Sequence, residues 1–212
     1  MKNIINQIRA IGIVPVIAIA DADKAVALAQ ALAAGGLACA EITFRTAAAA
    51  EAIRQIKDNV PDVLVGAGTI LSTEQADTAM QAGAQFLVSP GFNPRVVAHC
   101  QANNYFIIPG CATPSDMEAA LEMGLTLVKF FPAEQAGGLP YIKAVAAPYT
   151  SLDFLPTGGI GPKNLADYLS FPRVVACGGS WMATKDLIDA GDFATITHLS
   201  QEAAEIAGRG SR

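Results

Sequence analysis

The chain has 212 residues with a formal net charge of −5; 52% of the residues are hydrophobic and 16% are charged. This length is sufficient for one well-buried core and does not require a second domain. The sequence has no basic block and no interleaving of basic with aromatic residues, which excludes the usual nucleic-acid-binding classes, whereas a small anionic substrate remains compatible with the charge.

The first part of the chain combines a basic start with an apolar stretch. Ala18-Ile19-Ala20, at the end of residues 11–20, resembles a signal-peptidase site. However, Pro15 interrupts the stretch, and no segment approaches the roughly 18 apolar residues of a membrane span. The same residues fit a short helix that leads into a buried strand, so we expect a cytoplasmic protein with no membrane partner.

Short apolar runs alternate with alanine-rich helical stretches along the chain. The predicted strands cover residues 13–19, 39–43, 63–67, 86–89, 106–108, 125–129, 154–157 and 174–177. The predicted helices begin near residues 23, 46, 73, 93, 114, 139, 162 and 184, and a last helix near 193–208 is expected to pack outside. Most of these helices open with Ser, Thr, Asp, Asn or Pro, and several close with Gly, as helix ends prefer.

The apolar character of the predicted strands is typical of a parallel sheet covered on both faces. Eight strand-then-helix units favour a compact (β/α)8 TIM barrel, with an N-terminal helix over about residues 2–10 closing its bottom. A doubly wound open sheet is the alternative, but it usually has five or six strands and a GxGxxG turn that is missing here. No linker marks a boundary, so we predict a single domain over residues 1–212.

Cysteine and histidine show no metal-ligand spacing. The cysteines are Cys39, Cys100, Cys111 and Cys177, which form no CxxC pair, and the histidines are His99 and His198. We therefore predict reduced cysteines with packing roles, histidines with surface roles, and no bound metal.

Lys129 is the most informative residue, because an apolar run precedes it and Phe130-Phe131-Pro132 follows it. Loss of water disfavours the ammonium form, and a neutral lysine amine can form a Schiff base with a ketone. Glu41 lies within the second predicted strand, which is opposite the sixth strand in an eight-stranded ring. We expect the two side chains to meet at the barrel mouth, either as a proton-transfer pair or as a structural ion pair.

Other polar residues and glycines follow the predicted strands, where barrels place their active sites. Arg45 suits a substrate carboxylate, although a surface arginine at a helix start is the alternative. Gly158-Gly159 and Gly178-Gly179-Ser180 follow the last two strands, where barrels bind phosphate through backbone N–H groups. Thr69 and Thr157 are hydroxyl donors that can either bind substrate or cap the next helix.

Two segments resemble the signatures of a known family. Gly36, four residues, and then Glu41-Ile42-Thr43-Phe44-Arg45 is similar to one signature of the bacterial 2-keto-3-deoxy-6-phosphogluconate (KDPG) and 4-hydroxy-2-oxoglutarate (KHG) aldolases. Gly124, four residues, and then Lys129-Phe130-Phe131-Pro132-Ala133, with Gly137 further on, resembles the other. Gly-Ala-Gly-Thr, Ser-Pro-Gly, Ile-Pro-Gly and Pro-Thr-Gly-Gly-Ile occur in the family's order, so the resemblance covers nearly the whole chain.

The resemblance implies a class I lyase on a (β/α)8 barrel that needs no metal or cofactor and is usually a homotrimer. Lys129 would form the Schiff base, Glu41 would act as general acid and base, and Phe131 would form an apolar wall beside the imine. The implied reaction is cleavage of KDPG to pyruvate and glyceraldehyde 3-phosphate in the Entner–Doudoroff pathway. Cleavage of KHG to pyruvate and glyoxylate would be a second activity.

The resemblance also assigns the substrate contacts. Arg45 and Thr69 would hold the pyruvyl carboxylate, and Thr157 would lie near the C4 hydroxyl. Gly158-Gly159 and Ser180 would contact the phosphate. Two alternatives stay open: cleavage of the galactonate-derived epimer, 2-dehydro-3-deoxy-6-phosphogalactonate, and a non-catalytic barrel that binds phosphorylated metabolites.

Overall fold

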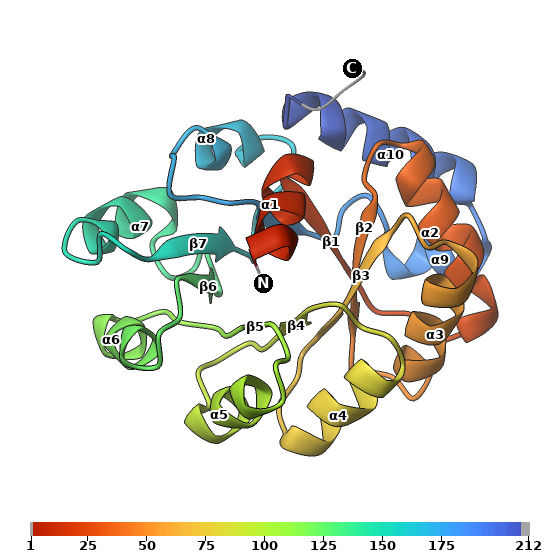
Figure 1. Ribbon diagram of the computed structural model, residues 1–212. Helices are drawn as coiled ribbons and strands as arrows, with labels where there is room; N and C mark the ends of the chain where they lie inside the picture. The colour runs from red at the N-terminus through yellow and green to blue at the C-terminus, as the bar shows by residue number, and fades with distance from the viewer. Residues whose placement is uncertain (1, 209–212) are drawn as a thin grey trace.

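Strands and helices alternate along residues 2–208, the part of the chain that the structure, a computed structural model, describes (Figure 1). The strands are β1 (Ile13–Ile17), β2 (Cys39–Thr43), β3 (Leu64–Gly68), β4 (Leu87–Val88), β5 (Ile107–Ile108), β6 (Leu127–Phe130), β7 (Asp153–Pro156) and β8 (Cys177–Gly179). The helices are α1 (Lys2–Ile11), α2 (Ala25–Ala34), α3 (Ala49–Asn59), α4 (Thr73–Gln81), α5 (Pro94–Ala102), α6 (Pro114–Glu122), α7 (Gly138–Ala146), α8 (Leu165–Leu169), α9 (Lys185–Ala190) and α10 (Phe193–Ile206), with a 3-10 turn η1 (Ala22–Lys24) before α2.

The paired strands run parallel and form a curled sheet. Six of them follow the order β5-β4-β3-β2-β1-β8, and β6 pairs with β7. Isolated parallel bridges join the two groups, Gly110 with Lys129 on the β5–β6 side and Thr157 with Gly178 on the β7–β8 side. Because the strands are parallel, their carboxyl ends lie at the same edge, and the side chains that follow them converge there.

The helices α2 to α10 lie around the outside of the strands (Figure 1). Every residue of β2 and β3 is buried, because helices cover the outer face of the sheet and other side chains fill the inner side. None of the helices within residues 2–208 is long and apolar enough to cross a bilayer.

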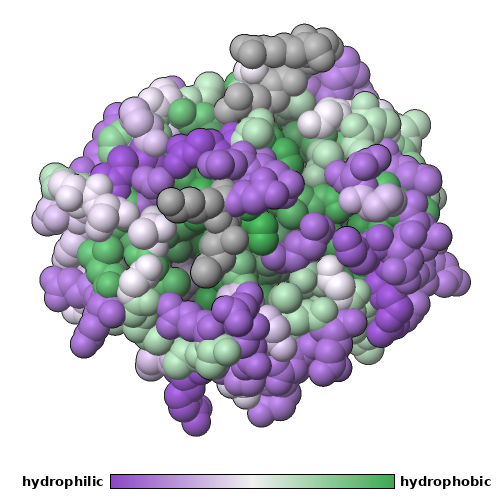
Figure 2. All heavy atoms as spheres, viewed as in Figure 1, coloured by the Kyte–Doolittle hydropathy of each residue, from purple (hydrophilic) through white to green (hydrophobic). Residues whose placement is uncertain are grey.

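The helix α1 lies across the middle of the strands rather than in the outer layer (Figure 1). It shares a separate core cluster with residues in or next to all of the strands: Ile8, Val14, Cys39, Leu64, Phe86, Val88, Ile108, Leu127, Leu155, Val175 and Ala176. Arg9 Nη2 lies 2.8 Å from Asp153 Oδ2 at the start of β7. On this face, hydrophilic residues cover much of the surface and hydrophobic residues show between them towards its middle (Figure 2).

Several element boundaries differ from those predicted. The last strand begins at Cys177 rather than at Val174, because Val174 makes only an isolated bridge with Phe154 and the ladder with β1 starts at Cys177. The helix expected near residue 162 begins at Leu165. Residues 161–164 form a turn instead, since Asn164 Oδ1 accepts a 2.9 Å hydrogen bond from the Gly161 N–H.

Candidate active site

Lys129 and Glu41 lie close together inside the protein, although their strands, β6 and β2, do not pair with each other. Lys129 in β6 is 5% exposed and Glu41 in β2 is completely buried. Lys129 Nζ lies 3.6 Å from Glu41 Oε1. This separation is longer than a hydrogen bond, and one water can link the amine to the carboxylate for proton transfer.

The Glu41 carboxylate has an unusual environment for a buried charge. Neither Oε1 nor Oε2 accepts a hydrogen bond from any residue between 2 and 208. A buried carboxylate normally has several donors, because leaving one unsatisfied costs free energy. The nearby Gly68 makes this position possible, since a Cβ on Gly68 would lie only 2.1 Å from Oε1. Glu41 is thus poised beside the lysine rather than held in a fixed network of donors.

The backbone around Lys129 is fixed by the neighbouring strand. Its N–H donates to Pro109 O at 2.9 Å, and its carbonyl accepts from the Cys111 N–H at 2.8 Å. The Lys129 Nζ lies 5.3 Å from the centroid of the Phe131 ring, and the Phe131–Pro132 peptide bond is cis. Phe131 is 37% exposed, so its ring contributes apolar surface next to the amine.

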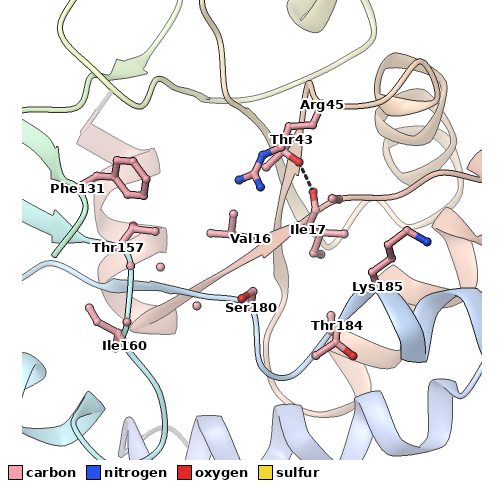
Figure 3. A pocket seen from close by; sticks show the side chains of 16 residues that line it. Val16, Ile17, Thr43, Arg45, Phe131, Thr157, Ile160, Ser180, Thr184 and Lys185 are labelled. Atoms are coloured by element: carbon pink, nitrogen blue, oxygen red, sulfur yellow. Dashed lines mark hydrogen bonds between the residues drawn. The ribbon is translucent and has the colours of Figure 1, made fainter. Parts of the chain in front are cut away.

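A cleft of about 370 Å³ opens beside this pair (Figure 3). The predicted site residues among those lining it are Arg45, Phe131, Thr157, Gly158, Gly159 and Ser180. The guanidinium of Arg45 points into the cleft, towards the side that carries Phe131 and Thr157 (Figure 3). Lys129 and Glu41 do not line this cleft themselves; Phe131, which does, has its ring centroid 5.3 Å from Lys129 Nζ.

Thr69 also lies outside the cleft lining but joins the site through Arg45. Arg45 Nε donates a 3.3 Å hydrogen bond to Thr69 Oγ1. Thr69 has a φ of 59°, in the left-handed region that non-glycine residues seldom adopt. The strained backbone places the hydroxyl against the guanidinium, and such strain is often found at functional sites.

The far end of the cleft is formed by the Gly158-Gly159 turn, with φ values of 107° and 77°. Thr157, just before it, is 8% exposed, and its Oγ1 has no hydrogen-bond partner within residues 2–208. Ser180 lies across from this turn (Figure 3). The cleft therefore has a cation near one end and glycine backbone at the other. That arrangement fits an elongated ligand with an anionic group at each end.

A family model described as KDPG and KHG aldolase matches residues 4–199. The chain belongs to the KDPG and KHG aldolase family. It is 52% identical over 208 residues to the 2-dehydro-3-deoxy-phosphogluconate aldolase of Treponema pallidum (strain Nichols), which covers 98% of this chain and 99% of that protein. It is 42% identical over 193 residues to the KHG/KDPG aldolase of Escherichia coli (strain K12), with 91% of each chain covered.

The fold of the chain is also similar to that of solved family members. One is the KDPG aldolase from Legionella pneumophila with pyruvate captured at low pH as a covalent carbinolamine intermediate. Its TM-score to this chain is 0.89 at 37% identity, with 93% of this chain and 96% of that chain covered.

Some residues that line the cleft of this KDPG and KHG aldolase family member were not predicted from its sequence. Val16, Ile17 and Thr43 form part of the wall, and Thr184 and Lys185 lie beside Ser180. Thr43 Oγ1 donates to Ile17 O at 2.8 Å, which ties β2 to β1. Lys185 directly follows Thr184, the N-cap of α9. That position after a strand is the signal that could have indicated Lys185 as a cleft residue. Its ammonium pairs with Asp189 and points away from the cleft centre (Figure 3).

The cysteines of this aldolase family member are free and buried. Burial, followed by the charge of Glu41, raises the pKa of the Cys39 thiol well above its ordinary value. Burial and the charge of Asp116 raise the pKa of Cys111 to about 12. These two thiols are therefore poor nucleophiles at neutral pH.

Proposed function

We propose that this chain is a class I aldolase that cleaves KDPG to pyruvate and glyceraldehyde 3-phosphate. Cleavage of KHG to pyruvate and glyoxylate is its second activity. The observation that carries the proposal is the position of the buried Lys129 amine, 3.6 Å from the Glu41 carboxylate. This carboxylate accepts no hydrogen bond from residues 2–208, and Arg45 and the Gly158-Gly159 turn line the neighbouring cleft. The names of the relatives and the carbinolamine in the Legionella pneumophila structure support it.

The first step joins substrate to the enzyme. The neutral amine of Lys129 attacks the C2 ketone of the keto acid, and the carbinolamine loses water to give an iminium ion. The positive iminium nitrogen can then accept the electron pair of the C3–C4 bond when that bond breaks. A lysine amine is suited to this step, because it forms Schiff bases with ketones in its unprotonated form.

The second step requires proton transfer. Glu41, acting through a water, removes the proton of the C4 hydroxyl, and the C3–C4 bond breaks to release the aldehyde and leave an enamine. The same carboxylic acid then protonates C3, and hydrolysis of the new imine frees pyruvate and the Lys129 amine. A single carboxylate 3.6 Å from the amine can serve both as base and as acid.

The substrate contacts follow the order of groups along the cleft. Arg45, positioned by Thr69, binds the pyruvyl carboxylate, and Phe131 covers the imine. Thr157, directly before the glycine turn, lies near the C4 hydroxyl. Gly158-Gly159 and Ser180 bind the phosphate. Fixing both ends of the substrate orients C2 towards Lys129, which contributes to the rate through proximity.

We further propose that the whole chain is one (β/α)8 TIM barrel domain over residues 1–212. The bridges on the β5–β6 and β7–β8 sides support closure of the ring. The core cluster shared by α1 and all of the strands supports α1 as the helix that closes the bottom. The family resemblance supports a cytoplasmic homotrimer in the Entner–Doudoroff pathway, with no metal, cofactor, nucleic-acid or membrane partner.

Borohydride trapping with pyruvate tests the chemistry. We expect the wild-type protein to gain one reduced pyruvyl adduct, which peptide mass spectrometry maps to Lys129. Lys129→Ala should lose both the adduct and KDPG cleavage, whereas Lys57→Ala, at an exposed lysine on α3, should keep both. Substantial turnover by Lys129→Ala would contradict the mechanism. A wild-type protein that binds pyruvate without forming an adduct would instead support a non-catalytic binding barrel.

The choice of C4 epimer is tested by the same pyruvate-release assay with KDPG and 2-dehydro-3-deoxy-6-phosphogalactonate. A higher kcat/KM for KDPG supports the proposed substrate, and a higher value for the galactonate-derived epimer supports the alternative. The two epimers differ only at the carbon that faces Thr157 in this assignment.

A further inference from the structure

Glu134 and Tyr168 form a pair directly behind the Gly158-Gly159 turn. Tyr168 belongs to the short helix α8 and is 2% exposed. Its hydroxyl donates a hydrogen bond to Glu134 Oε1. Neither residue lines the cleft that carries the candidate active site; both line a second cavity of about 510 Å³ on the other side of the turn.

The backbone of Glu134 orients the glycine turn. The Glu134 N–H donates to Gly158 O at 3.0 Å, and the preceding Ala133 N–H donates to Thr157 O at 2.8 Å. In a planar trans peptide the C=O and the following N–H point in opposite directions. Because the Gly158 carbonyl is turned towards Glu134, the Gly159 N–H is turned away from it, towards the side of the cleft.

The side chain of Glu134 packs against the same turn. A Cβ built on Gly159 would lie 2.6 Å from Glu134 Cγ and 2.7 Å from Glu134 Cβ. The aliphatic part of Glu134 is therefore in direct contact with the Gly159 backbone and limits its movement away from the cleft. The Tyr168 hydroxyl donates to the carboxylate and holds it in this position.

A third residue of the second cavity completes this support. Asn164 Nδ2 donates to Gly159 O at 3.2 Å, and Asn164 Oδ1 accepts from the Gly161 N–H at 2.9 Å. The carbonyls of Gly158 and Gly159 are thus both held from the side of the second cavity. The turn is fixed from behind, which leaves its other side to a ligand.

The Tyr168 hydroxyl remains protonated over the working pH range. Burial, then the hydrogen bond to Glu134 and the charge of that carboxylate, raise the pKa of Tyr168 well above its ordinary value. A phenol that stays protonated donates to a carboxylate as a charge-assisted hydrogen bond, which is stronger than a neutral one.

We propose that Glu134 and Tyr168 are positioning residues that fix the Gly158-Gly159 turn so that the Gly159 N–H faces the phosphate of the substrate. This inference rests on the function proposed above. Neither side chain touches substrate in this assignment; together they act through the glycine backbone. Their contribution should therefore appear only with substrates that carry a phosphate, and not in imine formation at Lys129.

The test compares a phosphorylated with an unphosphorylated substrate. We expect Tyr168→Phe, which keeps the ring and removes the hydroxyl, to lower kcat/KM for KDPG about tenfold, mainly through KM, because it loses one charge-assisted hydrogen bond. Cleavage of KHG and borohydride trapping of pyruvate should stay at wild-type levels. Glu134→Gln, whose amide oxygen still accepts from Tyr168, should retain most of the KDPG activity, whereas Glu134→Ala should resemble Tyr168→Phe.

The matched control is Tyr149→Phe, since Tyr149 also donates to a carboxylate, Glu118 Oε1 at 3.0 Å, on the exposed surface. It should leave both substrates unaffected. An equal loss with KDPG and KHG in Tyr168→Phe, or no loss with either, would overturn the inference; Glu134→Ala gives the same decision if Tyr168→Phe does not fold. A wild-type protein that neither traps pyruvate nor cleaves either substrate would instead refute the proposed function.

Discussion

Gly68→Ala should separate proton transfer from imine formation. Gly68 ends β3, and a Cβ there would lie 2.1 Å from Glu41 Oε1, 2.7 Å from its Cδ and 2.8 Å from its Cγ. Ordinary contacts begin near 3.4 Å, so the carboxylate must move by roughly 1 Å or more. A misplacement of about 1 Å can lower a rate about 100-fold, which corresponds to about 2.7 kcal/mol of transition-state stabilisation. Overpacking should also lower the free energy of unfolding by about 1–3 kcal/mol.

The assay measures pyruvate release from KDPG through coupled reduction to lactate, together with borohydride trapping and a thermal melt. We expect kcat of Gly68→Ala to fall about 100-fold while the pyruvyl adduct on Lys129 still forms. Gly91→Ala is the matched control, because a Cβ on Gly91 meets nothing within 4 Å. A folded Gly68→Ala protein whose kcat lies within about threefold of that control would refute the reasoning, since the carboxylate position would then not limit the rate.

Two further predictions concern the catalytic carboxylate and the stability of a helix start. Glu41→Gln should lower kcat for KDPG about 10²–10⁴-fold, as loss of a general acid–base group does, and unchanged kinetics would remove Glu41 from that role. Burial raises the pKa of Asp116, but hydrogen bonds from the Ala112 and Thr113 N–H groups outweigh it, so the pKa lies below its ordinary 3.8 in the folded protein. Asp116 therefore contributes stability at neutral pH that is lost as the pH falls below about 3.8 and through the lower folded pKa. In urea unfolding at stepped pH, the wild-type protein should lose this contribution below pH 4 and Asp116→Asn should show a smaller acid-induced loss, whereas parallel curves would contradict the assignment.

The sequence is informative where residue type and strand position coincide. Lys129 and Glu41 each interrupt an apolar strand, and a charged residue in such a place is unusual enough to be recognised. Parallel strands then require that the residues following them lie at one edge, which brings Arg45 and the Gly158-Gly159 turn to the same cleft. The parallel α/β architecture follows from the same alternation of apolar strands and helices.

Other features depend on contacts that no local pattern reports. Tyr168 and Glu134 are 34 residues apart in the sequence. They meet because the fold brings α8 next to the segment that follows β6. The left-handed φ of Thr69 could not be predicted from the sequence. A threonine after a strand is equally typical of an ordinary helix cap, which has no such strain. Strand boundaries shift for a similar reason: β8 starts at Cys177, where its ladder with β1 begins, and that register is set by the assembled sheet.

The pairing of β1 with β8, Ile13 opposite Cys177, joins two strands that are separated by most of the chain. Such a contact forms late in folding, because the entropy of closing so long a loop must be overcome first. As the chain is synthesised, β1 gains β2 as a neighbour early, but its other edge has no partner until β8 emerges. An unpaired edge can pair with another chain and aggregate. Gly12 O accepts a 3.0 Å hydrogen bond from the Cys177 N–H, so the backbone groups that face this edge of β1 have no strand partner before β8 arrives. Pairing with β8 therefore closes the ring and also removes the last open edge of β1 from other chains.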